Sequence, residues 1–166
     1  MTYPFFVSVK FEPTDAPKTP LTPVEGVDLA YNKGGSLEWT RFTVKGGCSY
    51  HQMWGGVAEY FNEFTRQLPD YAIVGWNLRN LEWPAIVFNT TVENTRLDRK
   101  LLLPPTQKWN NLPLVDLRNL VLQGGFSEEE FTLEEVYRSM AAKMETENPE
   151  PIAMVKFVYD KYAGLP

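Results

Sequence analysis

Two polar residues, Asn77 and Glu82, have the spacing expected of a ligand-binding turn in an α/β protein. The apolar run from Ala72 to Gly75 predicts a strand. Pro84 favours the first turn of a helix, because its missing N–H would be unpaired there in any case. Asn77 then follows the strand and Glu82 precedes the helix, at the sheet edge where open α/β folds bind ligands. We therefore take these two side chains as the first candidates for a site.

The chain before this turn predicts three strands and one helix. Residues 5–11 are β-branched and aromatic, which is typical of a strand. The prolines of residues 14–23 exclude a helix or an interior strand, so we expect a surface loop. Residues 26–31 and 37–44 predict a hairpin, because the glycines between them suit a tight turn. Apolar residues at spacings of three and four then indicate a helix over residues 51–68, ended by the proline that follows.

The chain after the turn predicts further helices and one more strand. A helix is expected from Pro84 to about residue 94, and residues 112–122 suit a strand that leads into a helix. Thr132, with a glutamate three residues later, forms a capping box that opens a helix over residues 133–144. The last helix is expected over residues 151–162. This order of elements predicts an α/β fold with an antiparallel front half.

Several segments, spread over nearly the whole chain, share the motifs of a nuclease family. They are Val9-Lys10-Phe11-Glu12, then Val74-Gly75-Trp76-Asn77 through Leu81-Glu82-Trp83-Pro84, then Leu114-Val115-Asp116-Leu117, and finally residues 132–136 and 152–165. In these motifs the chain resembles the RNase H-like 3′–5′ exonucleases of the DEDD class, especially a group of predicted exonucleases similar to the proofreading domains of family-B polymerases. The resemblance implies an RNase H-like mixed β-sheet flanked by helices, formed by residues 1–166 as a single domain.

The resemblance also implies which residues form the site. In the family, Asp-x-Glu ends an early strand and Tyr-x-x-x-Asp lies in the final helix. Four acids hold two metal ions, which activate a water and stabilise the leaving 3′ oxygen. The matching catalytic and metal-binding residues are Glu12, Glu82 and Asp160, with Lys10 in place of an acid; a shift of one residue puts Tyr159 at the last position. An active enzyme would bind Mg²⁺ or Mn²⁺ there, and an inactive one would need no cofactor.

These departures from the family pattern predict a degraded active site. A lysine ammonium donates hydrogen bonds but cannot ligate a metal ion. We therefore expect Lys10 to form an ion pair with Glu82 or Asp160 in place of a metal, and the domain to be inactive or weakly active.

Three functions remain open at this point. The first is an exonuclease-like domain with a degraded active site that binds 3′ ends of single-stranded DNA or RNA, or serves as a non-catalytic module. The second is an active metal-dependent 3′–5′ exonuclease, and the third is a protein-interaction module on an inherited nuclease fold. Asn77, Trp76 and Trp83 are the candidates for nucleic-acid binding, the two indoles by stacking on bases. The net charge of −5 argues against non-specific coating of nucleic acid.

Composition limits the setting in which the protein works. Cys48 is the only cysteine, so no intrachain disulfide can form and a reducing, cytoplasmic setting is expected. The apolar runs are too short for a membrane span, and the first residues lack the pattern of a signal peptide, so we expect no membrane association. Residues 96–118 are locally basic and residues 128–150 are acidic. Either segment is an ordinary solvated surface or a binding surface for a partner of opposite charge.

Overall fold

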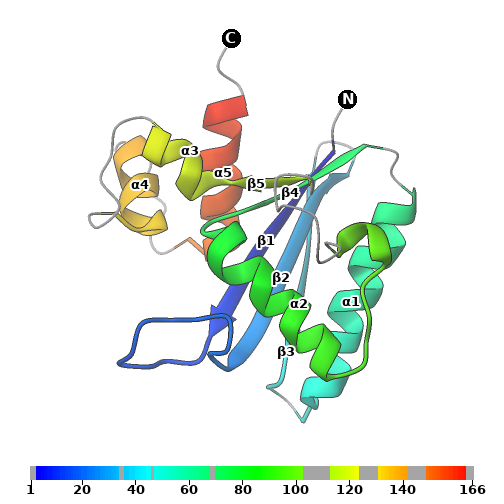
Figure 1. Cartoon of the computed structure of the whole chain (residues 1–166). Helices are drawn as coiled ribbons and strands as arrows, with labels where there is room; N and C mark the ends of the chain where they lie inside the picture. Colours follow the sequence, from blue (N-terminus) through cyan, green and yellow to red (C-terminus); the bar gives the residue numbers. More distant parts are fainter. Residues whose placement is uncertain are drawn as a thin grey trace.

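A five-stranded sheet forms the centre of the protein. The computed structural model describes residues 3–33, 36–45, 47–67, 70–102, 113–123, 131–141 and 149–163, and its strands lie in the order β3-β2-β1-β4-β5. The strands are β1 (Tyr3–Phe11), β2 (Val24–Lys33), β3 (Ser36–Thr43), β4 (Tyr71–Gly75) and β5 (Leu114–Asp116). The sheet is mixed and has helices on both faces, which confirms the α/β class (Figure 1).

The direction of each strand follows from its connections. β2 is antiparallel to both β1 and β3, and its pairing with β3 is the predicted hairpin. β4 is parallel to β1 and β5 is parallel to β4, because a helix lies between the strands of each pair along the chain. Phe5 pairs with Ile73 and Phe6 with Val74, so β1 and β4 are parallel neighbours whose carboxyl ends lie at the same edge of the sheet. This arrangement was expected from the sequence.

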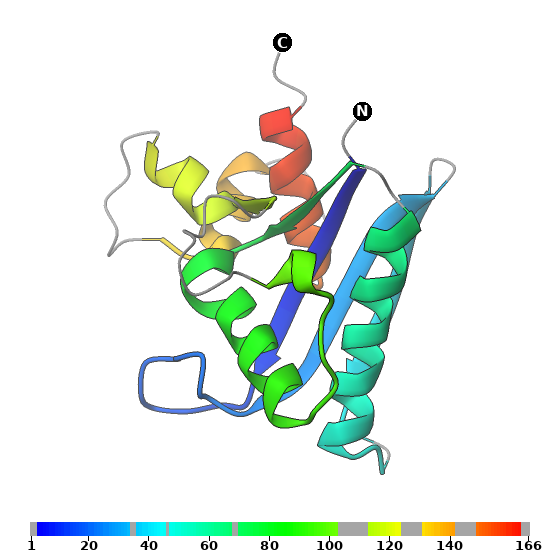
Figure 2. The ribbon, with the colours of Figure 1, turned by 45° about the vertical axis from the view of Figure 1, so that its right-hand side comes forward.

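Two hydrophobic cores hold the helices against the sheet. α1 (Tyr50–Gln67) and α2 (Trp83–Val92) lie on one face, and α3 (Leu117–Gln123), α4 (Leu133–Met140) and α5 (Pro151–Ala163) lie on the other (Figures 1 and 2). Successive side chains of β1 point to opposite faces, so Val7 and Val9 join the first core and Phe6 joins the second. β1 is therefore buried on both faces, as its apolar sequence predicts.

The segment between β4 and α2 differs from the predicted turn. Residues Leu78–Glu82 form a short π-helix, and α2 begins at Trp83, one residue earlier than expected. Asn77, which precedes the π-helix, has a φ of 52°, in the left-handed region. Non-glycine residues seldom adopt this region, and asparagine is one of those that tolerate it best. The wide helical turn advances the chain so that Glu82 faces back toward β1.

Some predicted features lie outside the described residues. They are residues 68 and 69, where the helix predicted over residues 51–68 is expected to end, residues 142–144 of the helix predicted over residues 133–144, and residues 128–130 and 142–148 of the acidic segment 128–150. Over the stretches that the structure describes, no helix combines the length and apolar character needed to cross a bilayer.

Candidate functional site

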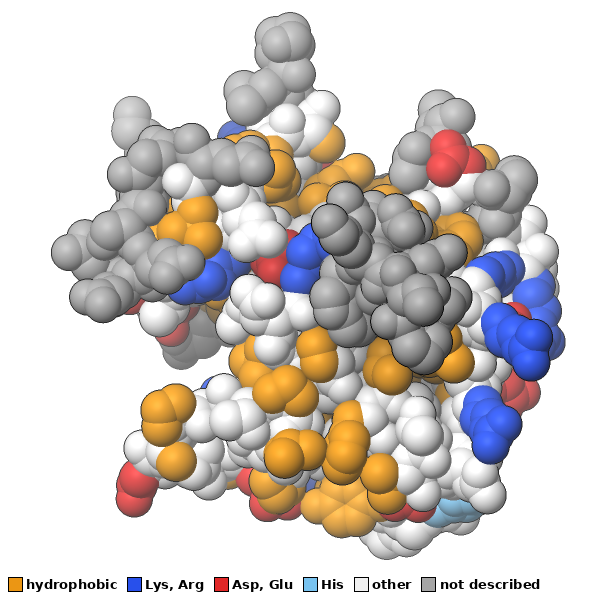
Figure 3. All heavy atoms as spheres, in the orientation of Figure 1, with side chains coloured by type: hydrophobic (Ala, Val, Ile, Leu, Met, Phe, Trp, Pro, Cys, Tyr) orange, Lys and Arg blue, Asp and Glu red, His pale blue; other side chains and the backbone are white. Residues whose placement is uncertain are grey.

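A cavity of about 600 Å³ opens where β1 and β4 end. Its wall includes side chains from β1, from the turn after β4, from the loop that follows β1 and from the first turn of α5, among them Ser8, Lys10, Lys18, Trp76, Glu82 and Val155. In Figure 3 the surface is hollowed on its left side, above the loop that follows β1. The cavity thus lies at the sheet edge predicted from the sequence.

Glu82 is the buried acid of this cavity, with only 8% of the residue exposed. Its Oε1 accepts a hydrogen bond of 3.2 Å from the backbone N–H of Val9. Pairing between β1 and β4 stops at Phe6, so the N–H of Val9 lies beyond the end of β4. A buried N–H left without a partner costs about 1–3 kcal/mol. The Glu82 side chain therefore completes the edge of β1 that β4 leaves open.

Burial also changes the acidity of this group. It raises the pKa of the Glu82 carboxyl well above its usual range. The hydrogen bond from Val9 lowers this pKa, the charge of Asp116 raises it, and Lys18 lowers it. Glu82 consequently holds its proton at a higher pH than an exposed glutamate does.

Asp116, at the end of β5, fixes the turn that carries Glu82. Its carboxylate accepts hydrogen bonds from the backbone N–H groups of Arg79, at 3.0 Å, and of Arg118, at 3.1 Å. Gly75 lets β4 pass close to β1, because a Cβ there would lie 3.3 Å from the carbonyl oxygen of Val7. These contacts set the position of the π-helix and hence of Glu82.

Asn77 contributes to the turn through its backbone. Its carbonyl oxygen accepts hydrogen bonds from the N–H groups of Leu81 and Glu82, at 3.1 and 3.2 Å. Its side chain is half-buried and is not among the residues that line the cavity. The geometry gives Asn77 a conformational role beside the site.

The structure does not bring Glu12, Glu82 and Asp160 together. Glu12 accepts a hydrogen bond of 3.0 Å from the hydroxyl of Tyr50, at the start of α1. Asp160 pairs with Lys156 one turn earlier on α5. Neither acid lines the cavity that Glu82 lines. Within the described ranges, no three acid, histidine or cysteine side chains are close enough to hold a metal ion.

The expected ion pair of Lys10 with Glu82 or Asp160 is wrong. Lys10 is exposed, and its Nζ lies 3.5 Å from the carboxylate of Glu25 on β2. The antiparallel register places Lys10 opposite Gly26, which brings the side chain of Glu25 within reach. Glu82 is meanwhile hydrogen-bonded to Val9.

The two tryptophans expected to bind bases have different environments. Trp83 is completely buried and packs edge-on against Phe61, with ring centroids 5.4 Å apart, so it cannot stack on a base. Trp83 is the first residue of α2, and its side chain lies in the first core. Trp76 is half-buried, lines the cavity and contacts Phe131 edge-on. Tyr159, the alternative last residue of the site, packs on Phe6 against the sheet.

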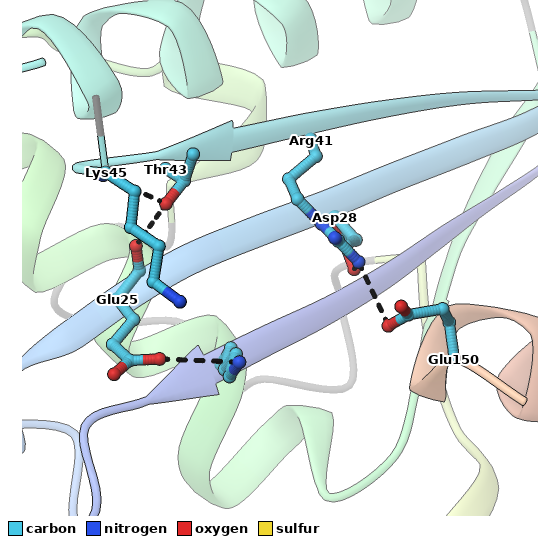
Figure 4. A network of polar contacts seen from close by, with 7 residues as sticks. Glu25, Asp28, Arg41, Thr43, Lys45 and Glu150 are labelled. Carbon is cyan, nitrogen blue, oxygen red and sulfur yellow. Dashed lines mark hydrogen bonds and ion pairs between the residues drawn. The ribbon is translucent and has the colours of Figure 1, made fainter. Parts of the chain in front are cut away.

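A charged network at the mouth of the cavity was missed from the sequence. Arg41 on β3 donates two hydrogen bonds to Asp28 on β2, at 2.8 and 3.1 Å, and a third of 3.0 Å to Glu150 beside α5 (Figure 4). The hydrogen bonds to Asp28 raise the pKa of the Arg41 guanidinium above its usual range. The predicted hairpin could have revealed the pair, since Asp28 lies opposite Arg41 in its register. No local pattern indicates that Lys18 reaches the cavity.

In comparisons with known proteins, the chain matches no protein-family model and no curated protein.

Proposed function

We propose that this chain is an exonuclease-like domain that binds the 3′ end of a single-stranded nucleic acid without cleaving it. The observation that carries the proposal is the set of side chains around the cavity at the ends of β1 and β4. The mixed sheet, with β1 and β4 parallel and helices on both faces, supports the RNase H-like arrangement that the motifs imply.

The spacing of the cavity residues supports the loss of catalysis. Ser8 and Lys10 are two residues apart on the same side of β1, like the acids of Asp-x-Glu. Pro151 and Val155 are four apart on α5, like the ends of Tyr-x-x-x-Asp. Ser8 and Lys10 precede Glu12 by four and two residues, and Pro151 and Val155 precede Asp160 by nine and five. These four residues line the same cavity as Glu82. A hydroxyl, an ammonium and an isopropyl group cannot replace three of the four carboxylates that two divalent ions need.

The same cavity contains side chains that can bind the phosphate, sugar and base at the end of a nucleic-acid strand. Lys10 and Lys18 line the cavity, and their positive charge attracts phosphate. Trp76 supplies an aromatic surface on which a base can stack. A protonated Glu82 could donate a hydrogen bond to a phosphate or sugar oxygen.

The test is to incubate labelled single-stranded DNA and RNA with the purified protein and excess Mn²⁺. We expect no shortening of the strand, and binding that weakens as salt is added. Lys18→Gln and Trp76→Ala should each weaken binding, whereas Lys161→Gln, an exposed lysine near the far end of α5, should not. Shortening that Glu82→Ala abolishes would refute the non-catalytic proposal.

A second candidate is a protein-interaction module, which the outer face of α2 favours. α2 has no charged residue, and its Phe88 and Val92 are 44% and 62% exposed. Figure 3 shows apolar side chains gathered on the face that α2 occupies in Figure 1. If the wild type binds no oligonucleotide, this surface becomes the better account. Phe88→Glu should then abolish capture of a protein partner while leaving the fold intact.

A further inference from the structure

We infer that the nucleic-acid site continues from the cavity across the open face of β2 and β3, where Trp39, Arg41 and Lys45 bind further nucleotides. The ligand is then a single strand of several nucleotides. This inference rests on the proposed function and specifies how much of the strand is bound.

A second hollow, of about 260 Å³, adjoins the cavity. Both hollows are lined by Lys10, Asp28 and Arg41, so they form one continuous groove. Beyond these shared residues, the second hollow is lined by Glu25 and Gly26 of β2, by Thr43 at the end of β3 and by Lys45 just after it. The groove therefore crosses from β1 to β3, a distance of about 10 Å for two strand spacings.

The register of the hairpin explains why polar groups line this groove. Asp28 pairs with Arg41 and Gly26 with Thr43, and these cross-strand pairs share one face of the sheet. The second core contains Ala30 of β2, nearer the other end of the hairpin, and α5 packs chiefly over β1. Figure 4 shows the resulting row of polar side chains from Lys45 and Glu25 to Arg41 and Glu150.

Two cations of the groove are placed to bind an anionic ligand, in a lining that also contains Glu25, Asp28, Glu82 and Glu150. In the described part of the chain, no carboxylate lies within ion-pair distance of Lys18 or Lys45, so both cations are available to phosphates. Arg41 is held by Asp28, whose side chain is only 12% exposed, while the Glu150 side chain is 49% exposed. A phosphate oxygen can therefore replace Glu150 on Arg41 while Asp28 keeps the guanidinium in place.

Trp39 provides an aromatic group beside Arg41, two residues along β3 from the side of the groove. It is 43% exposed, and the Arg41 guanidinium lies 5.1 Å from the centroid of its ring. An exposed indole beside an arginine suits the stacking of bases irrespective of their identity. Trp76 lines the cavity and Trp39 lies next to Arg41, so Lys10 and Arg41 lie between two aromatic rings, which is the pattern of a single-strand binding surface.

The experiment compares a dinucleotide with a hexanucleotide, both labelled at the 5′ end, in binding titrations at several salt concentrations. The hexanucleotide should bind wild type more tightly than the dinucleotide does. Trp39→Ala should weaken hexanucleotide binding at least about fivefold. Lys45→Gln should reduce the slope of log affinity against log salt by about 0.7 for the hexanucleotide. Neither change should affect the dinucleotide.

Matched controls separate the groove from general effects of the substitutions. Phe88→Ala removes an aromatic ring that is as exposed as Trp39 but lies on α2, and Lys161→Gln removes a distant positive charge. Both should bind the hexanucleotide as wild type does. Circular dichroism should show that all four variants are folded.

The outcomes distinguish this inference from the proposed function. Equal affinity of the two oligonucleotides for wild type, unchanged by Trp39→Ala and Lys45→Gln, overturns the extended groove and leaves binding in the cavity. A wild type that binds neither oligonucleotide overturns both. Tighter hexanucleotide binding that is lost in the two groove variants and retained in the controls supports the inference.

Discussion

Replacing Glu82 by glutamine should stabilise the protein at neutral pH and leave its stability nearly unchanged in acid. Glutamine has the same shape as glutamic acid, and its Oε1 can still accept the hydrogen bond from Val9. The substitution removes only the ability to ionise. Because burial raises the pKa of the Glu82 carboxyl, the charged form costs free energy in the folded state but not in the unfolded chain.

The sign and the size of the effect follow from proton linkage. Below the unfolded pKa, near 4.5, Glu82 is protonated in both states, so its contribution to stability is fully present. As the pH rises from there toward the raised folded pKa, the unfolded chain loses its proton first. The free energy of unfolding of the wild type then falls by at most about 1.4 kcal/mol per pH unit. The advantage of Glu82→Gln grows at the same rate and levels off above the folded pKa.

The assay is urea denaturation of wild type and Glu82→Gln from about pH 4 to about pH 8, with the free energy extrapolated to water. Glu59→Gln, which removes a charge from the exposed face of α1, serves as the control and should follow the wild type at every pH. If the difference between Glu82→Gln and wild type stays constant over this range, or shrinks as the pH rises, then the account of a buried carboxyl with a raised pKa is refuted.

Three further predictions concern stability and can be measured by the same denaturation experiments. Gly55→Ala should stabilise α1 by up to about 1 kcal/mol, because the added Cβ meets only ordinary van der Waals contacts. Gly56→Ala should destabilise the protein by about 1–3 kcal/mol, because its Cβ would lie 2.6 Å from the ring of Phe42. Equal effects of the two changes would contradict the packing of β3 on α1. Asp116→Asn should cost about 1–3 kcal/mol, since an amide has one acceptor oxygen for two backbone N–H groups; an unchanged midpoint would show that these bonds do not hold the turn. Thr132→Ala should cost about 1 kcal/mol by removing the hydroxyl that caps α4, and Thr132→Ser should restore it.

Several helices and strands of this fold could be predicted from local sequence patterns. The run of apolar residues in β1 and the three- and four-residue spacing in α1 predicted a buried strand and an amphipathic helix, and both are present. Thr132 predicted the start of α4, where its hydroxyl accepts a hydrogen bond from the N–H of Glu135. These features depend on neighbouring residues, whose periodicity reports which side of an element is apolar. The parallel pairing of β1 with β4 was also predicted and is confirmed, but its premise, that Glu12 and Glu82 meet at one edge, was wrong.

The residues that face the cavity depended on the tertiary structure. The sequence of this protein determined that Glu82 follows a strand and precedes a helix, but the π-helix turned its carboxylate to Val9. A bulge between Lys10 and Phe11 shifts the register of β1 on β2, and Glu12 lies beyond it, beside α1. Strand ends, bulges and the path of a loop depend on contacts between segments far apart in the chain. Periodicity carries no signal for such contacts. For this reason only the folded chain could show that Ser8, Lys10 and Val155, rather than Glu12 and Asp160, line the same cavity as Glu82.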